Sequence, residues 1–190
     1  MQPARYDRFS VTLHWLMAAL ILGQIALGLW MIGLPKDSTG LRASWFNVHK
    51  SLGMVLGLLI VLRLAWALLR PRVPAWPQAR RLQLAARGAH GLLYALMLVM
   101  PLSGFLSSVF SGYPIRFFGM QLPKLAARWE GAKDLLSGVH HISALALILL
   151  IVLHVLAFLY HQLVLKDALL QRMRWSDAGR RRAKQTAAPQ

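Results

Sequence analysis

Four long apolar stretches, separated by short polar segments rich in proline, glycine and basic residues, dominate the pattern of the chain. Each is long enough for an α-helix to cross a hydrocarbon core of about 30 Å. The predicted spans cover residues 10–34, 48–69, 88–110 and 138–165. We therefore predict an all-α integral membrane protein with an up-down-up-down four-helix bundle. Residues 1–170 form its single domain, and residues 171–190 form a basic tail predicted to be disordered.

The fourth stretch has the most informative polar pattern. Residues 135–165 contain four histidines and no Asp, Glu, Lys or Arg. His140, His154 and His161 are separated by whole heptads, so they project from one helix face within roughly 60° of each other. Since polar side chains in hydrocarbon are costly unless paired, ligated or facing a cavity, this alignment predicts a ladder of sites. His141 points elsewhere, and we interpret it as a hydrogen-bonding residue between helices.

Composition agrees with a membrane protein, because 57% of the residues are hydrophobic and only 15% are charged. The chain has no cysteine, which excludes disulfides, iron–sulfur clusters and thiolate ligation and leaves histidine as the main candidate metal ligand. A net charge of +16 is compatible with nucleic-acid binding. However, the basic residues lie between apolar runs, where they set orientation and contact anionic lipid, so we predict no nucleic-acid partner.

The distribution of Lys and Arg predicts the orientation in the membrane. The N-terminal segment, the segment after the second span and the C-terminal tail together carry 14 of these residues, against seven on the opposite side. Both termini are therefore expected in the cytoplasm. The first stretch lacks a clear cleavage site, so we interpret it as a retained first span of a multi-pass membrane protein.

This orientation sorts the histidines by depth. His49 begins the second span and His140 begins the fourth, so both lie near the outer face. Two neutral imidazoles from facing helices, in an otherwise apolar pocket, form the ligand set of a low-spin haem b. We predict that this pair holds an outer haem. Ser103 and Gly104, just beyond the helix-kinking Pro101, are small enough to admit close packing or a ligand.

The inner half contains more histidines than one haem requires. The 14-residue gap between His140 and His154 corresponds to about 21 Å along a helix, which suits two haems stacked in the bilayer. Using His161 instead would increase the gap to roughly 31 Å and place the haem among the headgroups. His154 is therefore preferred, although His161 remains an alternative. The histidines of the inner half are His14, His90, His154 and His161.

The chain resembles the bacterial cytochrome b561 family over about residues 5 to 174. The resemblance rests on four segments, which read RYDRFSVTLHWLMAALIL, HKSLGMVLGLLIVLRLAW, HGLLYALMLVMPLSGFL and HHISALALILLIVLHVLAFLYHQLVLKDALLQRM. Members of this family are compact inner-membrane proteins with two haems b. One characterised activity in the family is superoxide oxidase, in which electrons taken from superoxide reduce ubiquinone.

The resemblance implies roles for individual residues. It implies one haem held by His14 and His154 on the cytoplasmic side, and another held by His49 and His140 on the periplasmic side. It associates the inner, quinone-side end with His90, His161 and Lys166. Arg63 has two interpretations: it pairs with a haem propionate, or it extends to the cytoplasmic surface.

The functional hypothesis is electron transfer from superoxide outside to ubiquinone near the inner face. The outer segments carry a net charge of +4, which attracts a small anion. The chemistry is centred on the haems, and histidine or lysine side chains at the inner end supply protons to the quinone. The expected partners are superoxide, ubiquinone and membrane lipid, with no obligatory protein partner.

Two alternatives belong to other functional classes. In the first alternative, the chain is a haem-bearing membrane anchor that relays electrons between a soluble dehydrogenase or hydrogenase and the quinone pool. Against it, the short loops leave little docking surface apart from residues 102–136. Alternatively, it is a haem-free transporter in which buried histidines relay protons.

Overall fold

The computed structural model describes residues 5–36, 39–70, 73–74, 79–167 and 169–175. Within these residues, four long helices are apolar enough to cross a membrane, which confirms the helical membrane bundle. A two-stranded antiparallel hairpin lies between the third and fourth helices. The elements are α1 (Arg8–Met31), α2 (Leu41–Leu69), α3 (Arg80–Phe110), β1 (Arg116–Phe117), β2 (Met120–Gln121), α4 (Glu130–Tyr160), the π-helical turn η1 (His161–Leu165) and the 3-10 helix η2 (Leu169–Met173).

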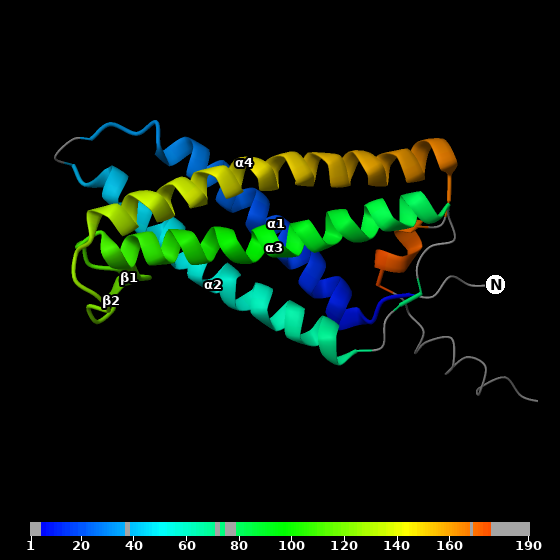
Figure 1. Cartoon of the computed structure of the whole chain (residues 1–190), viewed down its shortest axis with the longest axis horizontal. Helices are drawn as coiled ribbons and strands as arrows, with labels where there is room; N and C mark the ends of the chain where they lie inside the picture. Colours follow the sequence, from blue (N-terminus) through cyan, green and yellow to red (C-terminus); the bar gives the residue numbers. More distant parts are fainter. Residues whose placement is uncertain (1–4, 37–38, 71–72, 75–78, 168, 176–190) are drawn as a thin grey trace, which may run out of the picture.

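The four long helices run alternately toward and away from one end of the molecule (Figure 1). The hairpin and the α1–α2 connection lie at one end, and the start of α1 lies near η2 at the other (Figure 1). Hydrogen bonds join the two chain ends: the Tyr6 N–H donates to the Arg172 carbonyl at 3.2 Å. Trp15 Nε1 donates to the Met173 carbonyl at 3.0 Å. Both ends of the described chain therefore lie on one side of the bundle.

Three helices begin earlier than the apolar pattern predicts. We expected spans from residues 48, 88 and 138, but α2, α3 and α4 begin at Leu41, Arg80 and Glu130. The added turns are rich in Arg, Leu, Ala, Gln and Lys, which favour helix intrinsically. Glu130 also lies in the first turn of α4, where the helix dipole favours a negative charge. The apolar pattern thus marks the hydrocarbon-crossing part of each helix and misses its extension into the interface.

Asp7 starts α1 as its N-cap. Its carboxylate accepts hydrogen bonds from the Ser10 N–H at 3.0 Å and from the Ser10 hydroxyl at 2.7 Å. Trp66 Nε1 at the end of α2 also donates to it, at 3.4 Å. Burial raises the pKa of Asp7, but these hydrogen bonds outweigh burial and hold it below its ordinary value. The cap therefore ties the start of α1 to the end of α2.

An apolar cluster joins all four helices at the middle of the bundle. It separates the histidines into two layers, because Leu147 lies midway along α4 between His140 and His154. Most other large apolar side chains point outward, as expected where lipid replaces water. The buried members of the cluster are Met17, Ile21, Leu56, Ile60, Leu93 and Leu147.

The C-terminal segment departs from the predicted disordered tail of residues 171–190. Residues up to Met173 form η2, and Arg172 is buried. Its guanidinium donates to the Pro74 carbonyl at 2.6 Å and lies 5.7 Å from the centre of the Tyr6 ring. These contacts fix Arg172 against the bundle, whereas the basic composition of the segment predicted a solvated charge. Residues 176–190 of the predicted tail lie outside the described residues.

Ser51 fixes the hairpin to α2. Its hydroxyl lies 2.8 Å from the Asn47 carbonyl and accepts a hydrogen bond from the Phe118 N–H at 2.9 Å. Phe118 and Gly119 form the turn and both have positive φ, 46° and 91°, a conformation that favours glycine and is unusual for phenylalanine. The bond to Ser51 therefore stabilises the turn at the position where its own residue preference is weakest.

We predict that Ser51→Ala loosens the hairpin without unfolding the helices. Losing the acceptor for Phe118 costs about 1 kcal/mol, which speeds local opening about fivefold. Hydrogen–deuterium exchange of the amides of residues 116–121 in nanodiscs measures this change. Ser44→Ala is the matched control, because the Ser44 hydroxyl donates to the Gly40 carbonyl at the start of its own helix. Equal exchange in both variants contradicts the anchoring role.

Candidate functional site

The outer histidine layer consists of His49 from α2 and His140 from α4. Their ring centroids are 6.3 Å apart and their planes are nearly perpendicular, at 85°. Both side chains are half-buried. The depth argument from the sequence predicted that these two residues face one another, and the structure brings them together.

The inner layer consists of His14 from α1 and His154 from α4, with ring centroids 6.5 Å apart. His90 from α3 is the third member, because its ring centroid lies 5.5 Å from that of His154. His90 is exposed, and its Nδ1 donates to the Ala86 carbonyl of its own helix at 2.6 Å. The inner layer therefore contains one facing pair and one peripheral histidine.

Both facing pairs have the spacing of two imidazoles on one iron. A metal–nitrogen bond is about 2 Å long and the ring centre lies about 1 Å beyond the nitrogen, so two axial imidazoles have centroids about 6 Å apart. Among the described residues, no group of three or more His, Asp or Glu side chains is arranged to hold a metal ion alone. The histidines are thus suited to serve in pairs, as axial ligands of a macrocycle.

His140 is oriented as a ligand needs to be. Its Nδ1 donates to the Met100 carbonyl at 2.8 Å, so the proton is on Nδ1 and Nε2 keeps its lone pair. Metal-binding histidines characteristically donate their other ring N–H in this way. Gly104 provides the space, since a Cβ at this position would lie 2.7 Å from His140 Nδ1. The small residue that the sequence marked beyond Pro101 therefore borders the outer histidine layer.

His49 is positioned through its backbone. Gln24 Nε2 donates to the His49 carbonyl at 2.8 Å, and a Cβ at Gly28 would lie 3.5 Å from His49 Cε1. Within the described part of the chain, the buried His49 Nδ1 has no hydrogen-bond partner. A buried ring nitrogen without a partner is costly, which is consistent with a site designed around a further group.

His14 has a different environment from His140. Arg63 Nη2 lies 3.2 Å from His14 Nδ1, and Arg63 Nε donates to the Tyr94 hydroxyl at 3.2 Å. Arg63 is turned inward, so the interpretation that it extends to the membrane surface is wrong. Because a guanidinium only donates, this contact places the His14 proton on Nε2. Iron binding through Nε2 needs the other tautomer, so Arg63 has to leave His14 for that bond to form.

The remaining residues associated with the quinone side lie at the end of α4. His161 Nδ1 is 2.5 Å from Asp167 Oδ2, and both side chains are largely buried. Lys166 between them adopts a left-handed conformation, with φ of 49°. The sequence analysis did not identify Asp167, because it lies six residues after His161, a spacing that separates side chains on a regular helix. Its only sequence signal is a carboxylate that follows Lys166 at the end of an otherwise uncharged span.

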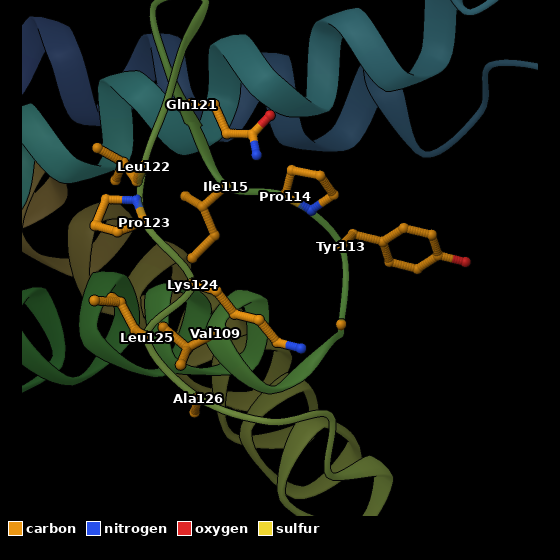
Figure 2. Close-up of a pocket in the computed structure, with 11 residues that line it drawn as sticks. Val109, Tyr113, Pro114, Ile115, Gln121, Leu122, Pro123, Lys124, Leu125 and Ala126 are labelled. Carbon is orange, nitrogen blue, oxygen red and sulfur yellow. The ribbon is translucent and has the colours of Figure 1, made fainter.

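Two cavities lie around the hairpin at the outer end. Figure 2 shows one of about 140 Å³, into which Gln121 and Lys124 extend while Tyr113 points away. The other, of about 360 Å³, lies between the hairpin and α2. One of its lining residues, Val48, directly precedes His49 in the sequence. Arg116 is its charged lining residue. The full lining of this second cavity is Ser44, Asn47, Val48, Ser51, Arg116, Phe118 and Gly119.

Known proteins resemble the chain over nearly its whole length. The family model described as prokaryotic cytochrome b561 matches residues 5–176. Cytochrome b561 homolog 2 of Escherichia coli (strain K12) is 34% identical over 90% of this chain and 92% of that protein. Cytochrome b562 of Cereibacter sphaeroides is 28% identical over 90% and 96% of the two chains. A probable superoxide oxidase CybB of Yersinia pestis is 26% identical over 89% and 95%.

These matches confirm the resemblance drawn from the sequence, and the four apolar helices agree with a multi-pass inner-membrane location. Family membership also implies haem b and electron transfer in the membrane. The chain therefore belongs to the prokaryotic cytochrome b561 family.

Proposed function

We propose that the chain holds two haems b, an outer one on His49 and His140 and an inner one on His14 and His154. The observation that carries this proposal is the pair of facing histidine couples, 6.3 and 6.5 Å between ring centroids, on either side of the apolar cluster. When bound, the haems supply reversible one-electron transfer. The protein positions the imidazoles in an apolar surrounding, and at His140 it also fixes the tautomer.

His154 is preferred to His161 as the inner ligand on two grounds. The His154 ring faces His14, whereas His161 is hydrogen-bonded to Asp167. Once Arg63 is released from His14, its guanidinium and the Tyr94 hydroxyl that it contacts lie beside the inner site. Such a pair of donors suits a propionate carboxylate.

We further propose that superoxide is the electron donor, at the outer face. Each superoxide loses one electron and becomes dioxygen. The cavity between the hairpin and α2 suits a small anion, because Arg116 lines it among otherwise neutral residues. The name of the Yersinia pestis relative, a probable superoxide oxidase, supports this choice. The basic flanking segments support cytoplasmic termini, which would place the hairpin end in the periplasm.

Ubiquinone is the proposed acceptor at the inner end. Two electrons, from two superoxide anions, and two protons convert one ubiquinone into ubiquinol. His90 and His161, with Lys166, are the proposed quinone-side residues, since an ammonium, or an imidazole protonated on both nitrogens, can donate a hydrogen bond to a quinone oxygen. Support comes from the position of His90 beside His154 and from the placement of His161 and Lys166 at the end of α4.

The ligand assignment predicts the haem content of single variants. Reduced-minus-oxidised spectra with pyridine-haemochrome quantification should give two haems b per chain for the wild type and about one for His49→Ala or His154→Ala. His141→Ala is the control, because His141 is exposed and its Nδ1 donates to the Ser137 carbonyl of its own helix. One haem in the wild type, or two in either variant, contradicts the assignment.

The close approach of Gly104 to His140 predicts that a larger residue at position 104 displaces the His140 ring and so removes the outer haem. Its replacement by alanine places a methyl group 2.7 Å from His140 Nδ1, so the imidazole must leave the Met100 carbonyl. We expect Gly104→Ala to lower haem content toward one per chain and to cost about 1–3 kcal/mol of stability. Gly88→Ala in the same helix meets nothing within 4 Å and should keep both haems. Equal haem content in the two variants contradicts the steric argument.

Superoxide docking predicts a local charge effect. Arg116→Glu should slow haem reduction by superoxide about tenfold at low ionic strength, and the difference should shrink with added salt. Rapid mixing with superoxide measures the rate. Lys36→Glu changes the charge of the same end by the same amount, so an equal loss in both variants indicates general steering instead of docking. A haem reduction no faster than spontaneous superoxide decay, with both haems present, would reject superoxide and favour the role of relay for a soluble dehydrogenase or hydrogenase.

A further inference from the structure

At the end of α4 the chain changes from an α-helix to a π-helical turn. The turn η1 covers His161–Leu165, and Lys166 follows in a left-handed conformation with φ of 49° and ψ of 35°. The N–H groups of Lys166 and Asp167 both point back to the His161 carbonyl, the latter at 3.2 Å. The chain therefore turns back at this point and brings Asp167 to the level of His161.

A regular α-helix would keep these two side chains apart. Residues six positions apart lie about 9 Å along the axis and on different faces. Here His161 Nδ1 and Asp167 Oδ2 are 2.5 Å apart, with side chains only 20% and 18% exposed. The other carboxylate oxygen, Oδ1, accepts the Leu169 N–H at 3.1 Å. Both oxygens are engaged, so the carboxylate has a fixed orientation toward the imidazole.

The partner of Nδ1 determines what Nε2 does. An ionised carboxylate only accepts hydrogen bonds, so the contact places a proton on Nδ1 and leaves Nε2 as the nitrogen that exchanges a proton. Around this pair lie the Tyr160 ring, 6.4 Å between centroids, and the adjacent Lys166.

We propose that Asp167 is a positioning residue that makes His161 the proton donor to the reduced quinone. This inference rests on the proposed quinone site at the inner end. His161 Nε2–H donates to a quinone oxygen and passes its proton as an electron arrives, and Nε2 then regains a proton from the cytoplasmic water. Two such cycles supply the two protons of one quinol, while Asp167 keeps the ring and its tautomer fixed.

The test separates the outer and inner halves of the reaction in holoprotein reconstituted in nanodiscs. Haem reduction by superoxide reports the outer half, and oxidation of pre-reduced haem by a soluble ubiquinone reports the inner half. We expect Asp167→Asn to slow the inner half about tenfold or more, with haem content and the outer half unchanged. Asp167→Glu restores the charge and should recover part of the rate.

Two further measurements distinguish positioning from a purely structural role. ¹⁵N spectra of histidine-labelled wild type should show His161 protonated on Nδ1, and Asp167→Asn should give a mixture of tautomers. In the background of His161→Gln, the substitution Asp167→Asn should cause no additional loss, because both residues act through one imidazole. A wild-type His161 whose Nδ1 carries no proton, or an inner rate that Asp167→Asn leaves unchanged, overturns the proposal.

Failure of the proposed quinone site gives a different result. If His161→Gln retains the full inner rate while both haems are reduced by superoxide, the quinone does not take its proton from His161. The tautomer measurement then still reports whether Asp167 fixes the ring, so the pairing and the quinone site are judged separately. Should Asp167→Asn fail to assemble with haem, the wild-type tautomer and the rate of Asp167→Glu decide the question.

Discussion

The arrangement depends on one constraint: a ring nitrogen placed in hydrocarbon needs a partner. At the outer layer, the Met100 carbonyl satisfies Nδ1 of His140, and Nε2 remains for a further ligand. At the inner layer, Arg63 occupies Nδ1 of His14. The apolar cluster around Leu147 keeps the two layers apart along the helices. The bundle therefore presents its polar atoms at two depths and stays apolar between them.

The ends of the bundle satisfy the same requirement with backbone groups and fixed side chains. At one end, the Ser51 hydroxyl accepts a hydrogen bond from the N–H of Phe118, a residue held at an unfavourable positive φ in the turn. At the other, buried Arg172 reaches the Pro74 carbonyl, and Asp7 caps α1 while accepting from Trp66. These contacts join segments that are far apart in the sequence. They hold the helix ends, and so the depth of each histidine, in register.

The sequence predicted the parts of this structure that depend on periodicity. Heptad spacing and span order were enough to pair His49 with His140, because each residue begins its span at the same end. The direction of Arg63 was not predictable, since its inward course depends on the position of Tyr94 on another helix. Helix length was underestimated because hydropathy ends where the hydrocarbon ends, while helix-favouring residues such as those before His90 continue into the interface. The close approach of Gly104 to His140 likewise needs the crossing of two helices.

His154 and His161 show most clearly what periodicity leaves open. They are seven residues apart on one helix face, so sequence spacing treats them as equivalent candidates for the inner ligand. Their partners distinguish them: His154 faces another imidazole, whereas His161 faces a carboxylate. An iron ligand works as a neutral imidazole, and a carboxylate partner holds a proton on Nδ1 of His161 and leaves Nε2 for proton exchange. The left-handed Lys166 produces this difference, because it turns the chain so that Asp167 meets His161 and not the solvent.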